Sequence, residues 1–214
     1  MKTILTLFGD HYHDRENLFN AFRTVLEVAV KDWILVDTTV EDFESFLDQQ
    51  PTVVVIAREN RINPEEKDVK YWMTQQIEEK IKDYVQNGGR LFVWHSGLAS
   101  YPENGVYCSL VKGYFKYHPD KQKLVRYHSD GKLVFGKQKV NFSILDEHYF
   151  VYCDEKSTNV YLYSESEDGK SLAGWWHNFG KGKVVVLTPA HSKDGLFDEN
   201  FQILLKMVVE ELFD

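Results

Sequence analysis

The chain has 214 residues, the length of one ordinary domain that can bury a sizeable apolar core. Hydrophobic residues make up 43% and charged residues 27%, a balance that argues against disorder and against a membrane-embedded protein. The formal net charge of -8 disfavours a nucleic acid partner, because the phosphate backbone is itself negative. We therefore expect a globular protein with neither nucleic acid nor membrane as a partner.

The first half of the chain alternates between short apolar runs and helical patterns. Strands are predicted at residues 4–8, 33–36, 53–57 and 91–94. Between these strands, apolar residues recur at helical spacing and predict three helices. The first covers 18–29. The second is capped by Thr39 and buries Val40, Phe43 and Leu47, and the third ends near 87–89. The run 53–57 is apolar at every position, which is typical of a parallel strand covered on both faces. This alternation predicts a parallel sheet with right-handed crossovers.

The second half has a different pattern. Lys123–Tyr127 and Lys132–Phe135 flank Ser129-Asp130-Gly131, which predicts a hairpin. Further strand-like runs lie at 149–153 and 160–163, and we expect them to be antiparallel or at a sheet edge. A strand at 184–187 and an amphipathic helix over 201–212 follow. Since no linker interrupts these elements, residues 1–214 are expected to form a single domain.

The cysteines and the lengths of the apolar runs indicate the cellular compartment in which the protein works. Cys108 and Cys153 show no CxxC spacing, so neither a disulfide framework nor a cysteine zinc site is expected. The apolar amino terminus stops at Gly9, too early for a signal-peptide core, and no run approaches the roughly 20 residues that cross a bilayer. A cytoplasmic location is therefore expected.

Polar side chains follow four of the predicted parallel strands. In open parallel sheets, ligands bind outside the carboxyl ends of the strands, so these positions are candidates for one crevice. Several imidazoles in one cleft could transfer protons or bind a metal, although a hydrated loop explains His11 and His13 equally well. The residues are Asp10, His11, His13 and Asp14 after the first strand, Arg58, Glu59 and Arg61 after the third, His95 and Ser96 after the fourth, and His191 and Ser192 after 184–187.

A second group of polar residues precedes the strand-like run at 149–153. Asp146 and Glu147, followed by His148 and Tyr149, offer carboxylates that could act as base, acid or metal ligand. A helix cap or a surface turn explains the same residues almost as well.

Five blocks of sequence, in order, resemble the ThuA-like family, which is named for trehalose utilisation and whose fold is related to class I glutamine amidotransferases. The resemblance covers most of the chain. This chain departs from the family pattern at Val93-Trp94 and at Ala190, where many members carry smaller residues. Bulky side chains next to the turn at His95-Ser96 would narrow the cleft. The blocks are His13-Asp14, residues 88–96 ending in the His95-Ser96 elbow, Gly113-Tyr114-Phe115 with His118-Pro119, Asp146-Glu147 with Tyr149, and Trp175 with 179–183 and 188–191.

The resemblance implies an α/β, three-layer flavodoxin-like or class I glutamine amidotransferase-like fold. Its central sheet is expected to be mostly parallel, with additional antiparallel strands in the C-terminal half, in a single ThuA-like domain over 1–214. Glutamine hydrolysis is excluded, because amidotransferases carry a cysteine nucleophile at the elbow where this chain has His95.

The family's association with sugar catabolism implies a hydrolase or lyase that acts on a small-molecule carbohydrate, such as a sugar or keto-glycoside. We assign catalytic roles to His95, His191 and Glu147, and a divalent metal, zinc or a similar ion, is a candidate cofactor. The expected ligand contacts are His13, Asp14, Ser96, His118 and Tyr149, and the expected metal ligands are His13, His95 and His118.

The alternative is a non-catalytic sugar-binding or regulatory module that keeps the amidotransferase-like scaffold without its nucleophile, since a fold does not carry its chemistry with it. Aromatic residues such as Tyr71-Trp72 could support a homodimer, although ordinary packing explains them equally well.

Overall fold

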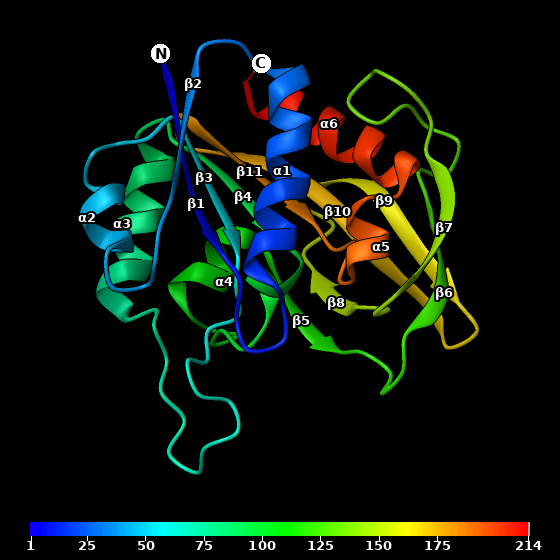
Figure 1. Ribbon diagram of the computed structural model, residues 1–214, viewed down its shortest axis with the longest axis horizontal. Coiled ribbons are helices and arrows are strands. Elements are labelled where there is room, and N and C mark those ends of the chain that lie inside the picture. The colour runs from blue at the N-terminus through cyan, green and yellow to red at the C-terminus, as the bar shows by residue number, and fades with distance from the viewer. Residues whose placement is uncertain (214) are drawn as a thin grey trace.

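A mixed nine-stranded sheet organises the computed structural model, which describes residues 1–213 (Figure 1). The strand order is β2-β1-β3-β4-β11-β10-β9-β6-β7. The first five are mutually parallel and the rest are antiparallel. The parallel strands are β1 (Lys2–Phe8), β2 (Trp33–Asp37), β3 (Val53–Ala57), β4 (Arg90–Trp94) and β11 (Gly182–Leu187); the others are β10 (Gly169–Phe179), β9 (Asn159–Ser166), β6 (Lys123–His128) and β7 (Asn141–Asp146).

Helices cover both faces of the parallel part of this sheet (Figure 1). In β3, Val53, Val55 and Ala57 join one core, and Val54 and Ile56 join the other. The α/β class, the parallel sheet and the antiparallel strands in the C-terminal half are thereby confirmed. One core takes α1 (Arg15–Ala29), α5 (Lys193–Leu196) and α6 (Glu199–Phe213), and the other takes α2 (Phe43–Leu47), α3 (Gln75–Gln86) and α4 (Val106–Val111).

A small second sheet pairs β5 (Gly113–Tyr117) with β8 (Phe150–Cys153). A 3-10 helix, η1 (His95–Leu98), follows β4 directly. Among residues 1–213, no helix combines the length and apolar character that crossing a bilayer requires.

Two local predictions are wrong. Thr39 does not cap a helix, because a turn over 40–42 intervenes and α2 begins at Phe43 without a side-chain cap. Lys132–Phe135 is not the hairpin partner of β6, which pairs with β7 instead. The connection over 129–140 is closed by Ser129, which exchanges hydrogen bonds with Val140, and it buries Val134 in the core. The short apolar run at 132–135 is therefore a packed loop.

One buried histidine far from the polar crevice predicts a pH dependence of folding. His177 in β10 is 3% exposed, and its Nε2 donates to the carbonyl oxygen of Leu110 at 2.9 Å. Burial lowers its pKa from 6.5 to about 4, so the unfolded chain takes up this proton first as the pH falls. The histidine therefore stabilises the fold above pH 6.5, and this contribution, roughly 3 kcal/mol, is lost as the pH falls toward about 4.

The measurement is urea unfolding of the wild type and His177→Gln across this pH range. Glutamine can still donate to Leu110 but does not titrate, so the variant should lose less stability on acidification by about that amount. Parallel stability curves for the two proteins would contradict the assignment.

Candidate active site

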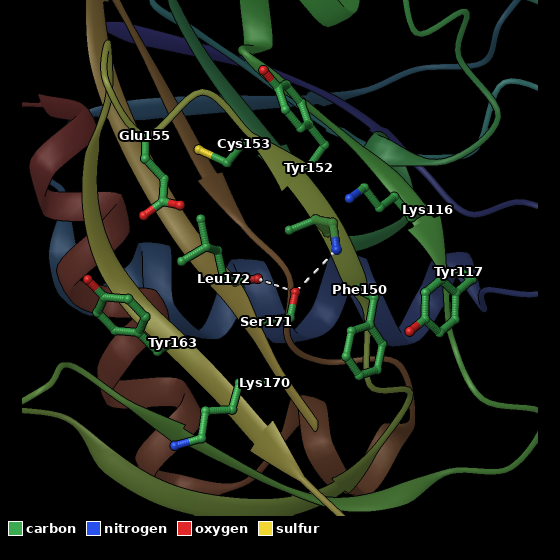
Figure 2. Close-up of a pocket in the computed structure, with 11 residues that line it drawn as sticks. Lys116, Tyr117, Phe150, Tyr152, Cys153, Glu155, Tyr163, Lys170, Ser171 and Leu172 are labelled. Atoms are coloured by element: carbon green, nitrogen blue, oxygen red, sulfur yellow. Dashed lines mark hydrogen bonds between the residues drawn. The ribbon is translucent and has the colours of Figure 1, made fainter. Parts of the chain in front are cut away.

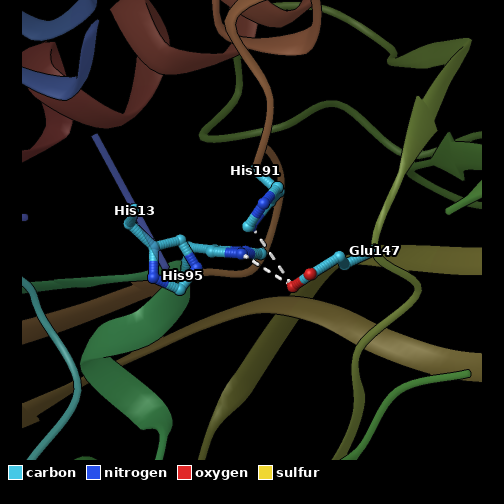
Figure 3. Close-up of side chains that lie close together, drawn as sticks. All are labelled: His13, His95, Glu147 and His191. Atoms are coloured by element: carbon cyan, nitrogen blue, oxygen red, sulfur yellow. Dashed lines mark ion pairs between the residues drawn. The ribbon is translucent and has the colours of Figure 1, made fainter. Parts of the chain in front are cut away.

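Four side chains from four separate turns meet at the carboxyl edge of the parallel strands (Figure 3). His13 follows β1, His95 follows β4, His191 follows β11 and Glu147 follows β7. One potential ligand atom from each lies within 4.8 Å of all the others. We call these residues the His/Glu group; they include three of the predicted histidines.

Backbone geometry at the end of β4 positions His95. This residue begins η1 with a positive φ of 44°, which turns the chain sharply out of the strand. Two residues later, a Cβ on Gly97 would lie 2.3 Å from the carbonyl oxygen of Ile56 in β3, so only glycine lets the turn pack this closely. The parallel pairing of β4 with β11 then brings the turn that carries His191 alongside.

Hydrogen bonds orient two of the imidazoles. The Nδ1 of His13 lies 2.6 Å from Oδ1 of Asp10, and the Nδ1 of His95 lies 2.5 Å from the carbonyl oxygen of Thr188. Because both partners are acceptors, each Nδ1 carries a proton, and in a neutral ring the Nε2 then has a free lone pair. Both Nε2 atoms are buried without a hydrogen-bond partner, as is Nδ1 of His191.

Glu147 supplies the negative charge of the group. Its Oε2 lies 3.3 Å from Nδ1 of His191 and 3.7 Å from Nε2 of His95. Burial raises the pKa of Glu147, but its interactions with His191 and His95 outweigh burial and hold the pKa below its usual range. Burial lowers the pKa of His95, whereas Glu147 outweighs burial at His191 and raises its pKa. The group therefore contains an ionised carboxylate and a neutral His95 imidazole.

Asp10 and Asp146 hold members of the His/Glu group in place through hydrogen bonds. Burial would raise the pKa of Asp10, but its contacts with His13 and two backbone N–H groups keep this pKa below its usual range. Asp146 is fully buried, and its Oδ1 accepts from the backbone N–H groups of Glu147 (3.0 Å) and His191 (2.8 Å). Its Oδ2 accepts from the Tyr127 hydroxyl at 2.7 Å. Asp146 thus joins the two loops that carry Glu147 and His191.

The other predicted site residues lie at different distances from the group. The Tyr149 ring stacks on His95 at 4.1 Å, and Ser96 is buried with an unpartnered hydroxyl. His118 is half-buried, with Nε2 3.9 Å from Glu147 Oε2, and it lies outside the His/Glu group. Asp14 is exposed and caps α1, because its side chain accepts from the backbone N–H of Asn17 at 2.7 Å.

A cavity of about 320 Å³ adjoins the group and is partly lined by His13, His118, Glu147 and Tyr149. The bulky elbow residues do not narrow it: Val93 and Trp94 are both fully buried, each in one of the two cores. A larger, more open cavity of about 530 Å³ lies over β8, β9 and β10, and none of the predicted site residues lines it (Figure 2).

The donor set of the group suits a divalent metal. Imidazole and carboxylate ligands are those of zinc and similar first-row ions, which histidine binds in its neutral form. With zinc–ligand bonds of about 2.0–2.1 Å, the ligand atoms of a tetrahedral site would be about 3.3 Å apart, and those of the group lie within 4.8 Å of one another. Metal-bound histidines usually donate their second N–H to a carboxylate or a carbonyl, as His13 and His95 do here.

Both cysteines lie outside the group and are unreactive by environment. They are free and buried, and burial raises the pKa of Cys108 to about 12 and that of Cys153 to about 11. A thiol is a weak nucleophile until it loses its proton, so the amidotransferase reaction has no nucleophile at this site.

Comparisons with known proteins agree with this architecture. A ThuA-like protein from Bacteroides uniformis aligns with a TM-score of 0.67 at 15% identity, covering 99% of this chain and 91% of that one. One from Parabacteroides merdae aligns with a TM-score of 0.69 at 14% identity, covering 97% and 88%. A β-galactosidase from Bacillus circulans aligns with a TM-score of 0.61 at 11% identity, covering 98% of this chain but 31% of that one.

No curated protein sequence matches the chain. The family described as trehalose utilisation matches residues 4–209, nearly the whole chain. The match spans His13, His95, Glu147 and His191 together with β4, β7, β11 and most of β1. The chain therefore belongs to the ThuA family.

Proposed function

We propose that this protein is a carbohydrate-metabolising enzyme, a metal-assisted hydrolase or lyase that acts on a sugar or keto-glycoside, on a flavodoxin-like scaffold. The observation that carries the proposal is the His/Glu group, whose imidazole nitrogens are buried: Nε2 of His13 has no hydrogen-bond partner, and Nε2 of His95 and Nδ1 of His191 share Oε2 of Glu147 at 3.7 and 3.3 Å. A buried, unsatisfied polar atom costs about 1–3 kcal/mol, so an unpaired imidazole nitrogen beside two others that share one carboxylate oxygen calls for a ligand. Family membership supports the carbohydrate class.

In this proposal His13 and His95 would bind the metal through Nε2, His191 through Nδ1 and Glu147 through a carboxylate oxygen. A bound zinc ion would act as a Lewis acid toward a substrate oxygen and lower the pKa of a water molecule. Asp10 and the carbonyl oxygen of Thr188 hold the two imidazoles in the tautomer that binds metal.

The cavity beside the group would hold the substrate. Both His118 and Glu147 line it, and His118, which is not a metal ligand in this proposal, is placed to exchange protons with a bound sugar. Tyr149, buried against His95, limits the access of bulk water to the histidines. Because both cysteines are free thiols, we place the reaction in the reducing cytoplasm.

The test is turnover of a panel of glycosides and 3-keto-glycosides, with and without added zinc, by the wild type and His95→Ala. We expect product from the zinc-loaded wild type and a loss of at least about a hundredfold in the variant, the lower range for removing a proton-transfer or metal-binding group. His128→Ala is the matched control, since His128 lies in β6 and stacks on Tyr163 away from the group.

Equal product yields from wild type and His95→Ala, with both proteins folded, would contradict the enzymatic role. Saturable sugar binding without turnover would instead support a non-catalytic binding module.

A further inference from the structure

A buried acidic side chain lines the cavity beside the His/Glu group. Glu59 follows β3, its side chain is 2% exposed, and it shares the 320 Å³ cavity with His13 and Glu147. Its backbone N–H donates to Oδ2 of Asp10 at 3.0 Å, which ties it to the residue that orients His13. An acidic side chain is rarely buried this deeply unless its oxygens are paired.

All the hydrogen-bond donors around Glu59 converge on one of its two oxygens. Oε2 accepts from Nη2 (2.7 Å) and Nε (2.8 Å) of Arg61 and from the hydroxyl of Ser100 (2.9 Å). The other oxygen, Oε1, is buried and has no hydrogen-bond partner. This arrangement fixes the carboxylate in place and leaves one of its acceptor oxygens unpaired.

The chemistry of this oxygen restricts the ligand. An ionised carboxylate only accepts hydrogen bonds, so the ligand has to donate one. Arg61 already balances the charge of Glu59, which favours a neutral donor such as a hydroxyl over a cation. The same cavity is lined by the rings of Tyr12, Phe115 and Tyr149, and aromatic faces pack against the apolar faces of sugar rings.

The size of the cavity points the same way. Its 320 Å³ lies at the small end of the roughly 300–1,000 Å³ of ligand pockets, a volume for one sugar ring rather than an extended oligosaccharide. We infer that Glu59 Oε1 accepts a hydrogen bond from a hydroxyl of a single neutral sugar ring bound in this cavity. Arg61 and Ser100 are positioning residues that hold the carboxylate. The inference takes its ligand class from the proposed function, but it concerns binding and not turnover.

The test compares sugar affinity in the wild type and Glu59→Gln. Glutamine keeps the size of the side chain and an oxygen for Arg61 and Ser100, but its amide group cannot accept at the Oε1 position. Isothermal titration with D-glucose, methyl α-D-glucopyranoside and α,α-trehalose should show binding of at least one of them to the zinc-loaded wild type, at least about tenfold weaker in the variant. Zinc affinity should stay within about twofold, because no member of the His/Glu group changes. Glu16→Gln, an exposed carboxylate in the first turn of α1, is the matched control.

A second measurement needs no variant and so does not depend on the folding of Glu59→Gln. Among singly deoxygenated analogues of the sugar that binds, one should bind the wild type at least about tenfold more weakly, because it lacks the hydroxyl that Glu59 accepts. Unchanged sugar affinity in folded Glu59→Gln, equal affinity for every analogue, or no sugar binding to the zinc-loaded protein would overturn the inference. Sugar binding that depends on Glu59 but leads to no turnover would overturn the proposed enzyme and leave this inference intact.

Discussion

Replacing His13 with alanine should weaken zinc binding roughly a hundredfold to a thousandfold, since one ligand of four carries about a quarter of a typical 10–16 kcal/mol. The effect is large because the Nε2 of His13 is buried without another partner and has its tautomer set by Asp10. Competition against a chromogenic chelator at fixed pH measures the affinity directly. His11→Ala is the control on the same loop, because the His11 side chain is 41% exposed and its partner is Glu65.

A second, milder variant distinguishes the loss of a zinc ligand from general damage to the loop. Asp10→Asn keeps the shape of the side chain but weakens the hydrogen bond that orients the His13 imidazole. Removing such a hydrogen-bond partner of a metal ligand costs about 10–100-fold in metal affinity. The order wild type, Asp10→Asn, His13→Ala is therefore expected for falling affinity. If His13→Ala binds zinc as tightly as the wild type, the His/Glu group is not a metal site.

The sheet and the place of the site could be predicted from local patterns. Apolar runs such as 53–57 mark buried parallel strands, and parallel strands end at a common edge. It follows that polar residues just after those strands come together, as His13, His95 and His191 do. These predictions succeed because each depends on a short segment and on one general property of parallel sheets.

Other elements cannot be predicted from local sequence patterns, because residues far along the chain stabilise them. The helix α4 was not predicted; its first backbone N–H groups are held by Glu78 of α3, which lies 28 positions before Val106. The strand β7 alternates buried and exposed residues over six positions, but the prediction of a tight hairpin at 123–135 placed the partner of β6 too early.

The finer composition of the site also depends on long-range contacts. The sequence predicts His13, His95 and His118 as metal ligands and gives His191 a proton-transfer or metal-binding role; the structure groups His191 with His13 and His95 and leaves His118 outside this group. Asp146 contributes to this arrangement, because its Oδ1 accepts a hydrogen bond from the backbone N–H of His191, 45 positions away. Glu59 could have been suspected from its position after β3, but its free oxygen follows from where Arg61 and Ser100 donate.

Trp94→Ala should destabilise the fold by about 3–5 kcal/mol, the usual cost of removing a fully buried aromatic side chain. The Trp94 ring lies edge-on to Phe8 at 6.1 Å and stacks on Phe92 and Phe201 at 6.0 Å, so it joins three elements of one core. Its indole nitrogen also donates to the carbonyl oxygen of Pro189 at 2.5 Å, and alanine leaves that buried acceptor unpaired. Urea unfolding at neutral pH measures the change.

Two further variants show which part of Trp94 matters. Trp94→Phe keeps an aromatic ring and loses the N–H donor, so its cost should be smaller, about 1–3 kcal/mol. Leu124→Ala in β6 should change stability by less than about 0.5 kcal/mol, because Leu124 is 68% exposed. A cost for Trp94→Ala no larger than that for Leu124→Ala would contradict the packing argument. The indole of Trp94 holds Pro189, which follows Thr188, the residue that orients His95, and lies in the turn that carries His191. A loss of zinc affinity in Trp94→Phe that exceeds its loss of stability would therefore show that this hydrogen bond positions that turn.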